Sequence, residues 1–196
     1  YISRYGFSED ILKQTINSLS GGERNILQLA KVSSSKANML LLDEPMSNLD
    51  VALRVKMREE IRAIQKKIGI TTLFITHDQQ EALAISDKIA VMKDGKVLQV
   101  GTPREIYNSP NQEFVANFVG VSNKINGKFI RPENLRLSRE ENGIPVTVTG
   151  VRFGGMYYEY TVKSETEEYR VLEINHGNSA KEWNVNDKGW LVAYEE

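Results

Sequence analysis

Three small residues near the start of the chain are suited to binding phosphate. Ser20, Gly21 and Gly22 are followed by Glu23 and by a stretch with helical periodicity. A serine hydroxyl and successive backbone N–H groups at a helix N-terminus bind phosphate oxygens, because the amides align with the helix dipole. The alternative for this segment is an ordinary helix cap, so its interpretation depends on the residues further along the chain.

Two adjacent carboxylates follow the next apolar run. Asp43 and Glu44 come directly after Met-Leu-Leu-Leu at residues 39–42, a short run typical of a strand buried on both faces. Adjacent residues at a strand end can reach one cleft, where one carboxylate holds Mg²⁺ and the other polarises a water molecule. The Asp43–Glu44 pair is thus a candidate site for a metal ion and a water molecule, and a solvated acidic turn is the alternative.

His77 follows another β-rich run, residues 70–75, and is expected at the same kind of sheet edge. An imidazole there could donate a hydrogen bond to a γ-phosphate or act near the attacking water, and a structural histidine is the alternative. Asp50 lies between these groups in the sequence. It is expected first as a helix cap and second as a residue of a catalytic loop.

The elements that would position these residues alternate between short apolar runs and amphipathic helices over residues 19–101. This alternation predicts βα units of a mainly parallel sheet. The clearest helix is expected to begin after Asp50 and to end at Gly69, with Lys66 and Lys67 in its last turn. Its apolar positions recur at helical spacing, at Leu53, Met57, Ile61, Ile64 and Ile68.

Local turn and cap signals define the next elements along the chain. Asp94 and Gly95 between two β-rich runs predict a type I′ hairpin. Thr102, Pro103 and Glu105 predict the capping box of a helix with proline at its first position.

The pattern changes after a short helix expected at residues 114–119. Short β-rich runs separated by Gly, Asn and Glu predict a small β-barrel, and we expect two domains, residues 1–121 and 122–196. Strands are expected at residues 146–151, 157–162, 169–174 and 190–194. Four aromatic residues are expected to fill the barrel core, and a ligand pocket is the alternative for them. They are Tyr157, Tyr158, Trp183 and Trp190.

Composition narrows the functional classes. The 196 residues carry a formal net charge of −1, and neither part of the chain has the clustered basic excess that nucleic-acid binding requires. There is no cysteine, so thiolate metal sites and disulfides are excluded. No apolar run is long enough to cross a bilayer, and we expect any link to a membrane to go through a partner.

Taken in order, these groups resemble the nucleotide-binding subunit of ABC transporters. The match covers the signature motif at residues 19–23, Walker B at residues 40–45, the D-loop at residues 47–50 and the switch-histidine loop at residues 75–78. The resemblance implies an α/β fold class, in which the C-terminal part of a P-loop ABC ATPase domain precedes an OB-like regulatory barrel.

The resemblance also implies roles for single residues, with ATP and Mg²⁺ as cofactors. Glu44 would be the general base and His77 would sense γ-phosphate, with Asp43 helping to hold Mg²⁺. Asp50 would couple two ATP sites across a head-to-tail dimer. Contacts with γ-phosphate across that dimer are implied for Ser20, Gly21 and Gly22 of the signature. Glu23 of the same motif is a candidate ATP-binding residue, and it would place a negative charge near the γ-phosphate.

Later segments point to a subfamily. Residues 94–103, 114–120 and 130–135 are similar to importers of polyamines, sugars, iron and oxyanions. Residues 75–137 look most similar to the polyamine importers for spermidine and putrescine. The implied protein is a peripheral ATPase at the cytoplasmic face of the membrane, which binds transmembrane permease subunits and a second ATPase subunit, and no nucleic acid.

Two departures from the family pattern stand out. Glu23 occupies a position where importers usually carry glutamine. The chain also contains no G-x-x-x-x-G-K-[ST] loop, which in the family lies upstream of the signature. We therefore expect that the ATP-cradling N-terminal half is missing from this sequence, and that residues 1–196 alone are inactive.

Two other functions are kept as alternatives. A DNA-repair or chromosome-type ABC ATPase shares the signature and the Asp-Glu strand end, but His77 and the Gly-Thr-Pro segment at residues 101–103 favour an importer. An inert ATPase remnant that carries a ligand-binding regulatory barrel is the third possibility.

Overall fold

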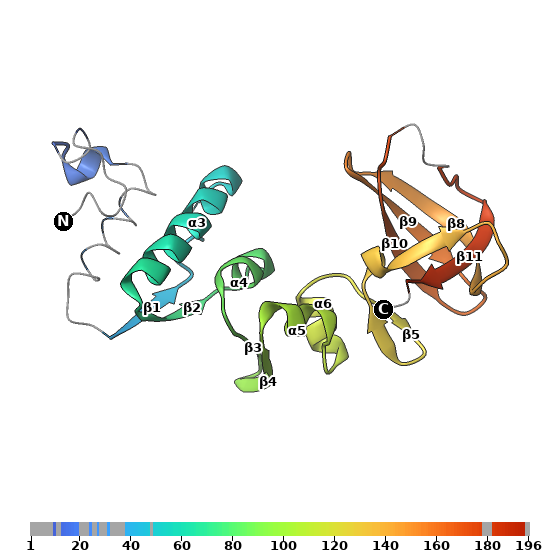
Figure 1. Cartoon of the computed structure of the whole chain (residues 1–196), viewed down its shortest axis with the longest axis horizontal. Coiled ribbons are helices and arrows are strands. Elements are labelled where there is room, and N and C mark those ends of the chain that lie inside the picture. The colour runs from blue at the N-terminus through green and yellow to red at the C-terminus, as the bar shows by residue number, and fades with distance from the viewer. Residues whose placement is uncertain are drawn as a thin grey trace. The chain divides into compact units, whose positions relative to one another are not determined.

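The computed structural model describes residue 10, residues 13–19, residues 24, 27 and 31, and residues 38–47, 49–177 and 182–194. The chain divides into two compact units, residues 1–89 and 90–196, and each is described by itself (Figure 1). The elements are η2 (Ile16–Ser18), β1 (Met39–Asp43), α3 (Val51–Ile68), β2 (Thr71–Ile75), α4 (Gln79–Ile85), β3 (Ile89–Lys93), β4 (Lys96–Gly101), α5 (Pro103–Asn108), α6 (Glu113–Phe118), β5 (Asn123–Ile125), β6 (Lys128–Ile130), η3 (Pro132–Asn134), β7 (Leu135–Ser138), β8 (Ile144–Phe153), β9 (Tyr157–Lys163), β10 (Glu168–Ile174) and β11 (Lys188–Ala193).

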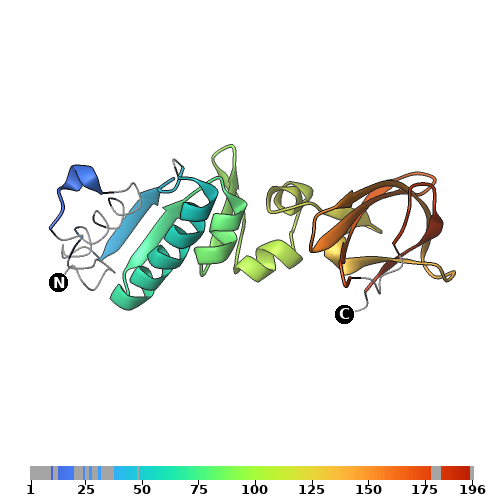
Figure 2. The ribbon, with the colours of Figure 1, turned by 90° about the horizontal axis from the view of Figure 1, so that it is seen from above.

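In the first unit, β1 and β2 form a parallel ladder, and Asp43 pairs with Ile75 at its end. Helix α3 joins the two strands and lies against one face of the ladder (Figures 1 and 2). This crossover keeps the carboxyl ends of both strands at one edge. Buried residues of the core are Met46, Met57 and Ile61, and Leu27, Leu40, Leu42, Leu49, Leu53, Ile64 and Phe74 pack around them.

Helix α3 begins and ends where its sequence signals predict. The Asp50 side chain accepts a hydrogen bond of 2.9 Å from the backbone N–H of Leu53. Gly69 ends the helix with a φ of 68°, a left-handed conformation that glycine adopts without strain. Lys66 and Lys67 in the last turn oppose the negative end of the helix dipole.

In the second unit, the β3–β4 hairpin turns at Asp94 and Gly95, whose φ values of 50° and 73° are both positive, as a type I′ turn requires. Helix α5 then begins with the predicted capping box, in which Thr102 and Glu105 satisfy each other's backbone N–H groups. The predicted change from helix to strand lies between α6 and β5. The division into domains at residues 121 and 122 stays a prediction.

The second unit ends in a five-stranded antiparallel sheet with the order β10-β9-β8-β11-β7. A register shift between Val148 and Gly150 bends β8, and the two edge strands β10 and β7 come into contact. Glu173 of β10 accepts a hydrogen bond of 2.9 Å from the backbone N–H of Leu137 in β7, across the seam between the edges. The predicted small barrel is therefore confirmed.

The barrel core differs from the expectation in its aromatic residues. Tyr160 is fully buried, and Trp183 is 5% exposed. Trp190 is half-buried and does not belong to the buried core cluster, because it lies near the middle of β11 between the buried Gly189 and Leu191 and faces the other way. The buried cluster consists of Leu135, Leu137, Val146, Val148, Tyr160, Val162, Tyr169, Val171, Trp183 and Leu191.

Candidate functional site at the carboxyl edge of the parallel strands

The structure brings Glu44 and His77 together at the carboxyl edge of the β1–β2 ladder. Glu44 directly follows β1, and its backbone N–H donates a hydrogen bond of 2.9 Å to the carbonyl of Ile75, the last residue of β2. This bond extends the ladder by one step beyond Asp43. The two segments predicted to carry chemistry thus leave the sheet side by side.

Glu44 adopts an unusual backbone conformation. Its φ is 42°, in the left-handed region that residues other than glycine rarely occupy. Such a conformation costs on the order of 1–3 kcal/mol and persists only where its surroundings impose it. Here the Glu44 carbonyl accepts a hydrogen bond of 3.2 Å from the N–H of Ser47, and the intervening Met46 is fully buried. The tight turn therefore directs the Glu44 side chain.

The Glu44 and His77 side chains are in direct contact, with 2.7 Å between Oε1 of Glu44 and Nδ1 of His77. The side chains are 44% and 76% exposed. The hydrogen bond with Glu44 and its charge raise the pKa of His77 above its usual value, and the charges of Glu81 and Asp78 raise it further. The site thus pairs an accessible carboxylate with an imidazole that is biased toward its cationic form.

Asp43 lies at the end of β1 with its side chain exposed. It shares the face of the strand opposite to α3 with Met39 and Leu41, because burial alternates along β1. Among the described residues, no three His, Asp or Glu side chains are grouped as ligands of a metal ion. A carboxylate nevertheless fits Mg²⁺, which proteins commonly bind through one or two carboxylates together with waters and substrate phosphates.

The remaining predicted residues stand as follows. Asp50 caps α3, which confirms the first of its two expected roles. Ser20, Gly21, Gly22 and Glu23 lie outside the residues that the structure describes, and their predicted roles in binding ATP stay predictions. Leu19, which precedes them, is buried.

Two residues beside His77 were not singled out in the sequence. Asp78 caps α4, since its Oδ1 accepts hydrogen bonds from the N–H groups of Gln80 at 2.9 Å and Glu81 at 3.2 Å. Thr76 Oγ1 donates to Oε2 of the buried Glu81 at 2.6 Å and accepts from the N–H of Asp78 at 3.0 Å. These bonds hold the loop that carries His77. An acidic residue directly before a helix is the signal that could have found the cap.

Of the helices that the structure describes, none is long and apolar enough to span a membrane.

Two segments of the chain match known family models, and most of its length is similar to curated proteins. Residues 2–47 match the ABC transporter family model, and residues 129–194 match the TOBE domain model. The chain is 38% identical over 194 residues to the spermidine/putrescine import ATP-binding protein PotA of Clostridium acetobutylicum, covering 84% of this chain and 55% of that protein. It is 37% identical over 188 residues to PotA of Borreliella afzelii, covering 81% and 54%. PotA of Spiroplasma citri is 38% identical over 210 residues, covering 89% and 60%.

The chain spans little more than half the length of these curated relatives. The resemblance seen in the motifs is confirmed over most of the chain. Residues 2–47 are therefore similar to the ABC transporter family and residues 129–194 to the TOBE domain family, and most of the chain is similar to import ATP-binding proteins.

Proposed function

We propose that this chain is part of the ATP-hydrolysing subunit of an ABC importer that takes up spermidine and putrescine. The observation that carries the proposal is the contact of Glu44 with His77 at the carboxyl edge of two parallel strands. Its setting supports the proposal, because residues 2–47 match the ABC transporter model and the named relatives import polyamines.

In the proposed mechanism, Glu44 orients the attacking water and accepts its proton. The turn that imposes a positive φ on Glu44 holds the carboxylate at the sheet edge, so less orientation remains to be achieved in the transition state. His77, whose pKa is raised, presents a cationic N–H to the γ-phosphate oxygens. An arriving phosphate would compete with Glu44 for His77 and release the carboxylate for the water.

Asp43 would help to hold Mg²⁺, which neutralises charge on the phosphate oxygens when it is bound. Ser20, Gly21 and Gly22 would contact the γ-phosphate bound to a second ATPase subunit in a head-to-tail dimer, and Glu23 and Asp50 would lie at that dimer interface. Transmembrane permease subunits would hold the dimer at the cytoplasmic face of the membrane. The TOBE domain would serve as the regulatory part.

The substitution Glu44→Gln tests this function in the complete ATPase subunit that contains these residues. It removes the proton acceptor and keeps the shape of the side chain, so we expect a loss of ATP turnover of about a hundredfold or more with ATP binding retained. Phosphate release and binding of a fluorescent ATP analogue are measured in parallel. Glu59→Gln on the exposed side of α3 is the matched control and should keep full turnover. Normal hydrolysis by Glu44→Gln would refute the assigned role.

A further inference from the structure

Arg54 of α3 contacts both loops that flank the Glu44–His77 pair. Its Nε donates a hydrogen bond of 3.2 Å to the carbonyl of Leu49, in the loop that follows β1. Its Nη1 lies 3.3 Å from Oδ2 of Asp78, the neighbour of His77 in the loop that follows β2. The Arg54 and Asp78 side chains are only 32% and 26% exposed, which limits solvent screening of their charges.

Together with two other contacts, these bonds connect the loop that follows β1 to the loop that follows β2 at two places. The Leu49 N–H donates to the Met46 carbonyl at 3.2 Å, which ties Leu49 to the turn that holds Glu44. Asp78 is covalently joined to His77, whose ring contacts Glu44. Arg54 thus links the two loops by contacts other than the Glu44–His77 pair.

The chemistry of the link requires arginine. A guanidinium presents donors on Nε and on both terminal nitrogens in a fixed plane, so it can serve a carbonyl on one side and a carboxylate on the other. An ammonium group is a single point of charge on a flexible stem. Lysine at this position could therefore reach Asp78 or Leu49 but would not hold both in one fixed geometry.

We propose that Arg54 is a positioning residue that makes the loop segment at Leu49 and Asp50 move as one unit with residues 76–78. A displacement of either loop then alters the Glu44–His77 contact through the other. The inference rests on the proposed function, in which the first loop faces a second ATPase subunit and the second loop senses phosphate. Arg54 would transmit the state of the subunit interface to the carboxylate that activates water.

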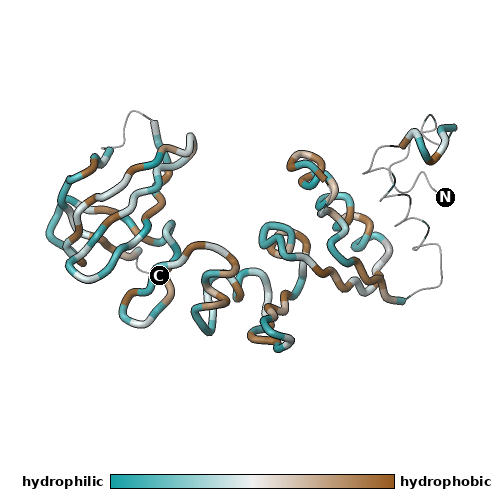
Figure 3. The backbone as a smooth tube through the Cα atoms, turned by 180° about the vertical axis from the view of Figure 1, so that it is seen from behind, coloured by the Kyte–Doolittle hydropathy of each residue, from teal (hydrophilic) through white to brown (hydrophobic). Residues whose placement is uncertain are grey.

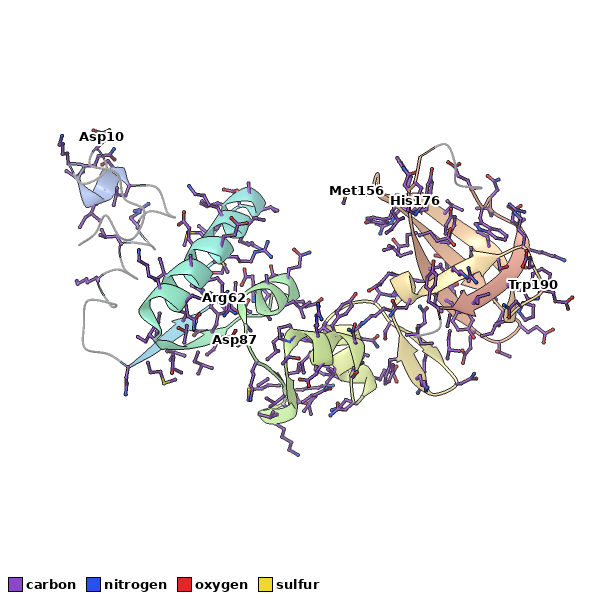
Figure 4. All side chains as sticks on the ribbon, in the orientation of Figure 1. Asp10, Arg62, Asp87, Met156, His176 and Trp190 are labelled. Atoms are coloured by element: carbon purple, nitrogen blue, oxygen red, sulfur yellow. The ribbon has the colours of Figure 1, made fainter. Side chains whose placement is uncertain are left out.

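A second ion pair on the same helix provides a matched control. Arg62 lies two turns further along α3 and pairs with Asp87, just beyond the end of α4 (Figure 4). Both arginines thus tie α3 to the flanks of α4, but in the described residues Arg62 contacts neither loop of the candidate site. If Arg54 served only to pack the two helices, loss of Arg62 would have a similar effect.

The test measures backbone amide hydrogen exchange by NMR in the 196-residue chain, at Leu49 for the first loop and at Glu81 for the second. We expect Arg54→Met to raise exchange about tenfold at both amides, since it removes two hydrogen bonds that involve a charged group. Asp78→Asn keeps an oxygen to cap α4 but removes the charge, and it should raise exchange at both amides. The double substitution should add little to either single one, because both remove the same link.

Two further variants distinguish positioning of the two loops by Arg54 from a general loss of stability of the first unit. Arg54→Lys should raise exchange at Leu49 and preserve Glu81, because the ammonium keeps its partner Asp78 and gives up the carbonyl. Arg62→Met should leave both amides unchanged. Exchange at Met57, in the middle of α3, shows in each variant that the helix remains folded.

Additive effects of Arg54→Met and Asp78→Asn, or equal effects of Arg62→Met, would overturn the inference. The measurement needs no nucleotide, so it is independent of the ATPase assay. A complete subunit that fails to hydrolyse ATP would refute the proposed function while the loops could still respond together. If Arg54→Met changes amide exchange at only one of the two loops, the role of Arg54 is refuted, whether or not the complete subunit hydrolyses ATP.

Discussion

At the scale of single residues, the electrostatics of the candidate site depend on one contact. The pKa of His77 is raised mainly by the hydrogen bond with Glu44 and then by the charge of Glu44, and desolvation opposes these two causes. The charges of Glu81 and Asp78 contribute less. The protonation state of the imidazole is therefore set by the residue that would also activate water.

The substitution Glu44→Gln should lower the pKa of His77. An amide can still accept a hydrogen bond from Nδ1 but offers no negative charge to favour the imidazolium, so the imidazole deprotonates at lower pH. The titration of the His77 ring resonances by NMR measures this change directly. Glu59→Gln on α3 removes a similar charge elsewhere and should leave the His77 curve in place; an equal shift in both variants would show that Glu44 has no special influence.

Glu173, at the seam of the barrel, differs from His77 because burial is the main cause of its pKa shift. Burial raises the pKa of its carboxyl group, and the hydrogen bond from the N–H of Leu137 lowers it by a smaller amount. The folded barrel therefore binds the proton more tightly than the unfolded chain does. Stability from this group is fully present below its ordinary pKa of 4.5 and is lost as the pH rises through the higher pKa of the folded state.

The substitution Glu173→Gln should remove this pH dependence. Glutamine keeps an oxygen to accept from Leu137 and carries no charge to be buried, so the free energy of unfolding of the second unit should vary less from about pH 4 to 7. Amide exchange of residues in β8–β11 measures that free energy, and the ¹³C resonance of the Glu173 carboxyl reports its pKa. If the stability of the native protein, relative to that of the Gln variant, rises with pH over this range, the sign derived for Glu173 is wrong.

At the scale of elements, one buried arginine joins helices to the start of the barrel. Arg131 is 3% exposed and stacks 4.2 Å from the centre of the Tyr107 ring. Its guanidinium donates to the carbonyls of Tyr107, Ala116, Gly120 and Val121 at 2.8–3.1 Å. Burial lowers the pKa of Arg131, but these carbonyls lie near the C-terminal ends of α5 and α6, where the helix dipole favours a cation.

Tyr107 and Glu133 complete this cluster. The Tyr107 hydroxyl donates to Oε1 of Glu133 at 2.7 Å. Burial and then this hydrogen bond raise the pKa of Tyr107 to about 12, so the phenol remains a neutral donor at physiological pH. The cluster thus connects α5 with the η3 turn that leads into the barrel.

The substitution Arg131→Met should destabilise the second unit by about 3 kcal/mol, because the buried carbonyl of Ala116 and partly buried carbonyls beside it lose a charged donor. Denaturant unfolding, with amide exchange of α6 as the local measure, tests this. Arg131→Lys should recover little, since an ammonium cannot reach carbonyls on both helices. Arg136→Met removes an exposed arginine that stacks on Tyr194 and should cost no more than about 1 kcal/mol. Equal losses of unfolding free energy in Arg131→Met and Arg136→Met would show that the buried Arg131 has no special role in joining the helices to the barrel.

At the scale of the whole chain, one face of the strand pair in the first unit is exposed, as judged from the residues that the structure describes. Met39, Leu41, Leu73 and Ile75 are 46–59% exposed on the face opposite to α3, and Leu41 lies directly beside Leu73 in the ladder. Figure 3 shows hydrophobic colour along this strand pair. Parallel strands are usually buried on both faces, so a chain of these 196 residues presents an apolar surface to water.

We expect the 196-residue chain to self-associate at micromolar concentrations through this face. Paired substitution of Leu41 and Leu73 by threonine keeps β-propensity and removes apolar area, so it should shift the chain toward the monomer. Sedimentation velocity over a range of concentrations measures the change. Val97 and Val100 of β4 are equally exposed and serve as the control pair. Unchanged association of the Leu41 and Leu73 variant would place the contact elsewhere.

The sequence by itself determined the features that depend on neighbouring residues. Helix α3 and its caps, the Asp94–Gly95 turn and the capping box at Thr102 were predictable because each relies on groups a few residues apart. The ABC motifs were recognisable for the same reason. Strands β5, β6 and β7 were missed, because three or four residues are too short to display an alternating pattern.

Only the tertiary structure decided which distant groups meet. Glu44 and His77 are 33 positions apart, and the parallel register of Asp43 with Ile75 brings them to one edge. Arg54 joins two loops through a backbone carbonyl and a carboxylate, and in the described part of the chain the guanidinium of Arg131 donates its hydrogen bonds to backbone carbonyls. Every residue carries a backbone carbonyl, so the amino-acid sequence does not indicate which carbonyls will accept these hydrogen bonds. The fold alone determines them.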